Sequence, residues 1–268
     1  NSQQALAVRG DTLMLAGIRQ YLVICTARDL EDYQTLLGDG THLGLEFRYA
    51  TQSSPRGIAE AFVIGREFIG SEPVALILGD NIFYGPGVRD KLSLATCRRE
   101  GATIYRCAVK DPERYGVIEL DAAGHPLGIV EKPARPCSCH AVTGIYFYDN
   151  DVVEIAHRIT PSRRGELEIT AVNRKYLGRG DLKVQLLGRG FAWLDTGTHQ
   201  SLLDADNFVE TIEKRQGLKI ACLEEVAYRM GYIDATQVEK LAFPFRKTEY
   251  GQYLYNMLTY EVRGVLKF

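Results

Sequence analysis

The chain has 268 residues, 46% of them hydrophobic and 25% charged, which is typical of an ordinary globular protein with a sizeable core. Its formal net charge of −2 leaves no basic excess for following a nucleic-acid backbone, and no apolar stretch reaches the roughly 20 residues that a membrane-spanning helix needs. Six scattered cysteines and an amino terminus unlike a signal peptide predict a cytoplasmic protein with free thiols.

Strand-like apolar runs alternate with helix-like runs through the first 110 residues. The sequence predicts strands at 21–27, 45–51, 74–80 and 102–109, separated by helices at 29–40, 57–70 and 88–101. This βαβα alternation is typical of a largely parallel sheet with helices on both faces.

From residue 115 the pattern changes to a hairpin, with two short strands around a turn at Ala123–Gly124. The elements expected after it are a strand at 141–149, a helix at 152–159 and two strands close together at 182–188 and 191–197. The last 70 residues favour helices. We therefore predict an α/β domain over residues 1–217, with a C-terminal helical segment, residues 218–268, packed on it.

Two of the predicted strands end abruptly in an aspartate. The run "VALILGD" ends at Asp80, and "GRGFAWLDTG" drives another apolar run into Asp195. Because open α/β sheets bind ligands beyond the carboxyl ends of their strands, both carboxylates are expected at one rim of one sheet. Such a pair suits Mg²⁺, which takes one or two carboxylates plus substrate phosphates. Each aspartate alone is also compatible with a turn or a cap.

Gln52 and Gly57, in "QSSPRGIAEA", come just before a predicted helix, whose free N–H groups favour an anion or a carbonyl-bearing base. Tyr115 and Gly116 lie in "ERYGVIE", where the glycine allows a close backbone approach.

Charged residues at two further places complete the candidate set. In "VEKP", Glu131 could accept from sugar hydroxyls and Lys132 could donate to a phosphate, and "RGELEIT" adds Glu166. By composition alone, these two stretches are also compatible with solvated surface and a helix N-cap.

Taken together and in order, these stretches resemble the sugar-nucleotide pyrophosphorylases, most closely those of the glucose-1-phosphate thymidylyltransferase type. The resemblance covers residues 12 to 260. The segments that carry it are "TLMLAGIRQ", "QSSPRGIAEAF", "LILGDNIFYG", "RYGVIE", "VEKP", "AVTGIYFYD", "GELEIT", "GRGFAWLDTGTH", "EKRQGLKIACLEEVAYRMG" and "YGQYL".

The resemblance implies a Rossmann-like nucleotidyltransferase fold, with a mixed and mostly parallel sheet flanked by helices and a C-terminal helical appendage. It implies transfer of a deoxythymidylyl group from dTTP to glucose 1-phosphate, giving dTDP-glucose and pyrophosphate for dTDP-rhamnose and related deoxysugars. It further implies Mg²⁺ as cofactor, a homotetramer, and neither nucleic acid nor membrane as partner.

The resemblance also assigns roles to residues. Asp80 and Asp195 would hold the metal and, with Lys132, serve catalysis. Gln52 would read the base, Gly57 would pack against the nucleotide, and Asp80 would lie beside it. The residues implied for the sugar phosphate are Tyr115, Gly116, Glu131, Lys132, Val142, Tyr146 and Glu166.

The sequence departs from the family at its start, where the family has a strand and a phosphate-cradling loop of the type "GGSGTRL". On this ground residues 1–217 are expected to be an N-terminally truncated domain. Two alternatives follow: an impaired member or fragment that acts as a sugar-nucleotide-binding or regulatory subunit, and an enzyme that uses UTP or CTP instead. Gln52 does not decide the second, because thymine and uracil present the same hydrogen-bonding edge.

Overall fold

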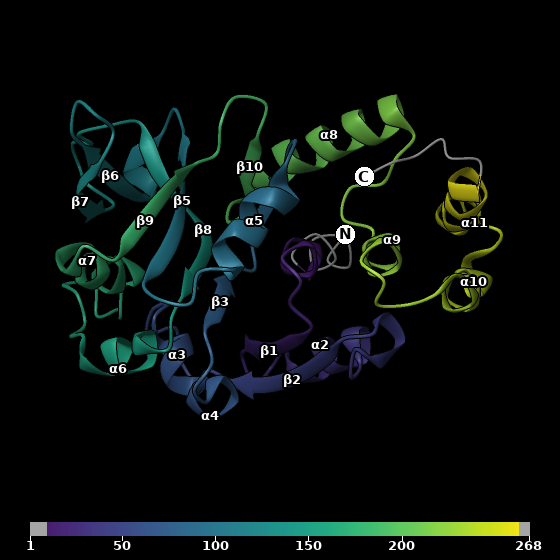
Figure 1. Cartoon of the computed structure of the whole chain (residues 1–268), viewed down its shortest axis with the longest axis horizontal. Helices are drawn as coiled ribbons and strands as arrows, with labels where there is room; N and C mark the ends of the chain where they lie inside the picture. The colour runs from purple at the N-terminus through teal and green to yellow at the C-terminus, as the bar shows by residue number, and fades with distance from the viewer. Residues whose placement is uncertain (1–9, 263–268) are drawn as a thin grey trace.

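A mixed six-stranded sheet lies at the centre of residues 10–262, the part of the chain that the computed structural model describes, with side chains given for residues 10–259 (Figure 1). The order is β7–β6–β8–β5–β9, and β3 also pairs with β8. The strands are β3 (Val74–Ile77), β5 (Ala102–Ala108), β6 (Gly116–Leu120), β7 (Pro126–Glu131), β8 (His140–Tyr148) and β9 (Leu182–Leu186).

Two smaller strand pairs flank this sheet. β1 (Gln20–Cys25) and β2 (Glu46–Thr51) run parallel, and β4 (Asn81–Tyr84) and β10 (Ala192–Asp195) form an antiparallel ribbon. A mixed sheet flanked by helices confirms the predicted α/β class.

The expected dominance of parallel pairing is wrong for the strands that the structure describes. Only β1–β2 and β5–β9 are parallel there, and the other five strand pairs are antiparallel. The βαβα alternation constrains only successive crossovers, whereas β8 follows the β6–β7 hairpin and inserts antiparallel between β3 and β5. The strands expected at 182–188 and 191–197 also separate, since β9 pairs with β5 and β10 with β4.

The described helices flank the strands, and only some of them cover the central sheet. The helices are α2 (Leu30–Leu37), α3 (Glu60–Ile64), α4 (Arg66–Ile69), α5 (Val88–Thr96), α6 (Asp151–Arg158), α7 (Ile169–Arg179), α8 (His199–Gln216), α9 (Leu223–Arg229), α10 (Ala235–Ala242) and α11 (Glu249–Val262). Short 3₁₀ turns lie at Thr41–Leu43, Pro112–Arg114 and Phe243–Phe245. Among these described helices none is long and apolar enough to cross a bilayer.

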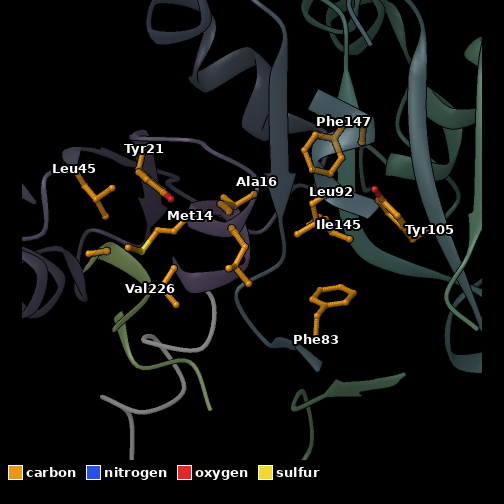
Figure 2. Packing of buried hydrophobic residues seen from close by; sticks show 14 of the residues in the cluster. Met14, Ala16, Tyr21, Leu45, Phe83, Leu92, Tyr105, Ile145, Phe147 and Val226 are labelled. Atoms are coloured by element: carbon orange, nitrogen blue, oxygen red, sulfur yellow. The ribbon is translucent and has the colours of Figure 1, made fainter. Parts of the chain in front are cut away.

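The alternation of side chains along β8 divides the core into two layers. Tyr146 and Tyr148 pack with α3, α6 and α7 on one face, whereas Ile145 and Phe147 pack with α5 on the other. A helix over residues 10–15 belongs to the second layer, where Met14 lies between β1–β2 and α9 (Figure 2).

The C-terminal helices share an apolar cluster of their own, built from Cys222, Val238, Ala242, Leu254 and Met257. α9 also contributes Val226 and Ala227 to the main core. α8 ends at Gly217, which adopts a left-handed conformation with φ 69°. The division after residue 217 thus coincides with a helix end, and it stays a prediction.

Asp11 is a carboxylic acid buried in this core, with 7% of its surface exposed. Its Oδ1 accepts a hydrogen bond from Thr12 Oγ1 at 3.2 Å. Burial raises the pKa of Asp11 to about 8, and the Thr12 hydroxyl offsets this only in part. The folded chain therefore holds a proton that the unfolded chain releases near pH 4.

Because the pKa is higher in the folded state, the stabilising contribution is complete below about pH 4 and is lost as the pH rises toward 8. We expect Asp11→Asn to remove this loss and to raise the free energy of unfolding at pH 8.5 by at least about 1 kcal/mol. Urea unfolding at pH 5 and pH 8.5 measures the difference. Asp206→Asn, an exposed change on α8, serves as control. Equal pH dependence in Asp11→Asn and wild type would contradict the prediction.

Candidate active site

The two predicted carboxylates meet across the β4–β10 ribbon. Asp195 ends β10 opposite Asn81, and Asp80 directly precedes Asn81. The backbone N–H of Thr196 donates to Asp80 O at 2.7 Å, which fixes the two strand ends together. A Cβ on Gly197 would lie 3.1 Å from Asp195 Oδ1 and 3.2 Å from Asp80 Oδ2, so both carboxylates face one small space that a side chain would fill.

The buried amide of Asn81 supports this arrangement from below. Its Nδ2 donates to Asp80 Oδ1 at 2.7 Å, and its Oδ1 accepts from Trp193 Nε1 at 2.6 Å and from Gly144 N at 2.9 Å. Only 2% of Asn81 is exposed. One side chain thus links the loop of Asp80, strand β10 and central strand β8.

Arg114 places a positive charge against the pair. Its guanidinium donates to Asp195 Oδ2 at 3.1 Å and to Asp111 Oδ2 at 2.9 Å. The neighbouring Tyr115 packs its ring against Trp193, with centroids 4.9 Å apart. Burial is the main cause that raises the pKa of the Tyr115 phenol, and the negative charge of Asp195 is the second. The phenol therefore stays neutral.

The donor set fits a hard divalent cation. Two carboxylates face one small space. Asp80 Oδ1 accepts from Asn81, Asp195 Oδ2 accepts from Arg114, and Asp195 Oδ1 also accepts from the backbone N–H of Gly197 at 3.0 Å. Within residues 10–262 no cluster of three or more His, Cys, Asp or Glu side chains could hold a metal by itself. Two carboxylates with remaining positions open to phosphate oxygens are the arrangement that Mg²⁺ favours.

A second polar group forms where the β6–β7 hairpin meets β8 and α7. Gly116 pairs with Glu131, and Thr170 Oγ1 donates to Glu131 Oε2 at 2.5 Å. A Cβ on Gly116 would lie 3.1 Å from Thr170 Oγ1 and 3.8 Å from Val142 Cβ. The fold thus brings Gly116, Glu131 and Val142 together.

Tyr146, on β8, links the two groups electrostatically. Burial raises the pKa of its phenol, and the negative charges of Glu131 and Asp80 raise it further, so the phenol stays neutral. Its side chain is almost wholly buried, with 3% exposed.

Lys132 has an unusual backbone. Its φ of 40° makes it one of two non-glycine residues with positive φ among residues 10–262, the other being Ala221. Its N–H donates to Tyr115 O at 3.0 Å, and within the same residues no carboxylate pairs with its ammonium group. A strained residue that carries an unpaired cation beside a carboxylate cluster is typical of a binding site.

Glu166 lies at the edge of the second group. Arg164 binds it at 2.9 Å and also approaches Glu168 at 3.5 Å and Glu131 at 3.9 Å. The arginine therefore occupies acceptor positions of three acids at once.

Gln52 and Gly57 lie on a loop that is joined to the 162–168 loop. Leu167 N donates to Arg56 O at 2.7 Å, and Ala59 N donates to Leu167 O at 3.1 Å. Gly57 has φ 105°, and a Cβ there would lie 2.5 Å from Leu167 N. The close contact with Leu167 is thus sufficient to explain why position 57 is a glycine, and no bound nucleotide is needed for that explanation. Gln52 Nε2 donates to Glu60 Oε2 at 2.5 Å, and the interactions described do not join it to the carboxylate pair.

Sequence reasoning missed the residues that support the site, namely Asn81, Arg114, Thr170, Trp193 and Gly197. Three of them had a signal in the chain. Asn81 and Arg114 are direct neighbours of predicted site residues, and Trp193 is the only tryptophan in the sequence. The position of Thr170 beside Glu131, and that of Gly197 beside Asp80, depend on pairing between distant segments.

The nucleotidyl transferase family model matches residues 6–212. The glucose-1-phosphate thymidylyltransferase of Xanthomonas campestris pv. campestris (strain B100) is 54% identical over 90% of this chain and 82% of its own length. That of Neisseria meningitidis serogroup A is 53% identical, over 92% and 85%, and that of Mycobacterium tuberculosis (strain H37Rv) is 53% identical, over 92% and 85%.

Two solved structures share the fold. UDP-glucose pyrophosphorylase, in complex with UDP-glucose, gives a TM-score of 0.67 over 78% of this chain and 87% of that one, at 22% identity, a likeness of fold alone. A Bacillus anthracis structure assigned to the glucose-1-phosphate thymidylyltransferases gives 0.70 at 36% identity, over 76% and 81%.

The contact at Gly57 predicts a specific sensitivity. We expect Gly57→Ala to lower the free energy of unfolding by more than about 2 kcal/mol, because the new methyl group meets the Leu167 backbone and the residue has positive φ. Gly165→Ala is the matched control, since Gly165 has φ 78° with nothing within 4 Å of an added Cβ. Urea unfolding of both variants measures the steric part. Equal losses would show that backbone conformation alone sets the cost.

Proposed function

The chain belongs to the nucleotidyl transferase family, and we propose that it is a glucose-1-phosphate thymidylyltransferase, which joins dTTP and glucose 1-phosphate into dTDP-glucose and pyrophosphate. The sequence identity of 50–54% to relatives of that name over most of the chain supports the reaction. The observation that carries the site is the convergence of Asp80 and Asp195 on one point beside Arg114.

Asp80 and Asp195 would hold Mg²⁺, which would supply neutralisation of charge on the triphosphate. Arg114 and Asn81 keep the two carboxylates oriented through the hydrogen bonds described above. Gln52 gives up its hydrogen bond to Glu60 and forms hydrogen bonds with the base. The segment around Gly57 packs against the nucleotide.

The sugar phosphate lies over the second polar group. Glu131, held by Thr170, accepts hydrogen bonds from sugar hydroxyls. Glu166 does the same after its ion pair with Arg164 opens. Gly116 and Val142 leave room for the ring, and the neutral phenols of Tyr115 and Tyr146 donate. Lys132, whose ammonium is unpaired among residues 10–262, contacts the phosphate.

The reaction needs no general base. The attacking phosphate oxygen is already ionised near neutral pH, so the chain has to align two anions and compensate their charge. Lys132 and Arg114 provide the protein's part of that compensation. Thymidine as the preferred nucleoside, a homotetrameric assembly and a cytoplasmic location remain predictions, and competition between dTTP and UTP tests the first.

Loss of either carboxylate is the first test. We expect Asp80→Asn and Asp195→Asn each to lower the rate of pyrophosphate release from dTTP and glucose 1-phosphate about 10²–10³-fold, as removal of a charge-stabilising group does elsewhere. Asp206→Asn, exposed on α8, should keep wild-type activity.

Release that survives in Asp80→Asn would come from a contaminating enzyme or another site and would contradict the assignment. Folded wild-type protein that binds glucose 1-phosphate without releasing pyrophosphate would favour the alternative, a binding or regulatory subunit.

Lys132 is tested through substrate affinity. We expect Lys132→Met to raise the KM for glucose 1-phosphate about 10–100-fold, the effect of losing a hydrogen bond to a charged group, with a smaller effect on the KM for dTTP. Lys183→Met, an exposed change on β9, is the control. Equal rises in both KM values would argue against a contact specific to the sugar phosphate.

A further inference from the structure

Two cysteines without a role in the proposed reaction lie in the connection between β7 and β8. Cys137 and Cys139 are both exposed, and Ser138 between them is partly buried. We call the two cysteines the 137/139 thiol pair. Because they are two residues apart in the chain, their Cα atoms lie no more than about 7 Å apart. A disulfide bridges Cα atoms at about 4.4–6.8 Å, so at most a small movement of the backbone is needed to join the two sulfurs.

Ser138 holds the middle of the pair against the central sheet. Its hydroxyl donates to Ile118 O on β6 at 2.6 Å and accepts from the backbone N–H of His140 at 3.1 Å. Val109 N, directly after β5, donates to Cys139 O at 2.9 Å. The backbone around Cys139 is therefore fixed between two strands, while its side chain stays exposed to solvent.

The other cysteines of the chain are less reactive or stand apart from a second exposed thiol. Burial is the main cause that raises the pKa of Cys25, Cys107 and Cys222, which lowers the fraction of reactive thiolate. Cys97, directly after α5, is exposed, but the nearest cysteine in the sequence is Cys107, which is only partly exposed. The 137/139 thiol pair is thus the place where two exposed cysteines lie next to each other in the chain.

The pair has too few neighbouring ligands for a metal site of the zinc type, which takes four protein ligands when it is structural. Among the residues that the structure describes, no three His, Cys, Asp or Glu side chains are grouped so that they could hold a metal ion. His140 therefore does not add a third ligand to the two sulfurs. The pair is better suited to a reaction that two thiols carry out by themselves, which is thiol–disulfide exchange.

We propose that the 137/139 thiol pair is a redox modification site, which small disulfides of the oxidised-glutathione type convert into a Cys137–Cys139 disulfide. The thiolate of one cysteine attacks a sulfur of the small disulfide, forms a mixed disulfide and releases one small thiol. The thiolate of the other cysteine then attacks the protein sulfur of the mixed disulfide and releases the second small thiol. The two cysteine protons end on the two released thiols, so one disulfide is reduced for each one formed.

Ring closure has a kinetic advantage and a thermodynamic limit. The second step is intramolecular, so the second cysteine attacks at a high effective concentration. The ring closed by residues 137–139 is small, and strain in a disulfide makes it easier to reduce. We therefore expect the bond to form under oxidising conditions and to reopen when reduced glutathione is in excess. The inference rests on the exposed thiols and is independent of the proposed reaction.

The test uses the full chain, incubated with reduced and oxidised glutathione at graded ratios. Free thiols are blocked with iodoacetamide, disulfides are reduced with dithiothreitol, and the thiols released are labelled with N-ethylmaleimide. Peptide mass spectrometry locates each label, and the intact mass before reduction distinguishes an internal disulfide from a glutathione adduct. Cys137→Ser and Cys139→Ser each remove one partner. Cys97→Ser, which also removes an exposed thiol, is the matched control.

We expect N-ethylmaleimide on Cys137 and Cys139 together, at least about tenfold more often than on Cys97, because only the pair closes a ring. Cys137→Ser and Cys139→Ser should instead accumulate a glutathione adduct on the remaining cysteine, whereas Cys97→Ser should behave as wild type. Three results would overturn the proposal: adducts without an internal disulfide in the wild type, a disulfide from either cysteine to Cys107, or no reversible oxidation of the pair at the most oxidising ratio.

Discussion

The geometry of the candidate site depends on one buried amide, that of Asn81. It holds Asp80 through its Nδ2, while its Oδ1 binds β8 at Gly144 and β10 at Trp193. A buried amide without hydrogen-bond partners would lower the free energy of unfolding by about 1–3 kcal/mol. The folded state therefore favours the arrangement in which all of these hydrogen bonds are made. Gly144 is required for the contact, because a Cβ there would lie 2.6 Å from Asn81 Cγ. The relative positions of the two carboxylates therefore depend on the buried hydrogen bonds of Asn81.

This anchoring explains why the site lies where the central sheet meets the β4–β10 ribbon. β8 passes through the core with aromatic side chains on both faces, and it carries Val142 and Tyr146, two of the residues proposed to hold the sugar phosphate. The β6–β7 hairpin adds Gly116 and Glu131 along its edge. Strands thus hold Gly116, Glu131, Val142, Tyr146 and Asp195, whereas Asp80 and Arg114 lie in turns beside them.

The sequence allowed the α/β class and the carboxylate pair to be predicted, because an apolar strand that ends in aspartate is a local pattern. It did not allow the strand directions, since insertion of β8 between β3 and β5 depends on pairing across more than 30 residues. β4 and α7 were missed for a related reason. Asn81–Tyr84 is too short to show a period of its own, and the acidic start of the α7 region was read only as a possible cap. The helix expected at 57–70 is divided at Gly65.

The hydrogen bonds between the 52–59 and 162–168 loops have a consequence for engineering. Arg56 and Ala59 bind Leu167 on both of its backbone groups, and Gly57 lies against the same residue. These hydrogen bonds couple the conformations of the two loops, so a change in the segment proposed to read the base is expected to shift the segment proposed to hold the sugar. Grafting either loop from a relative would break the shared backbone pairing. The two loops should therefore be exchanged together. Among relatives, sequence changes in one loop should be accompanied by changes in the other.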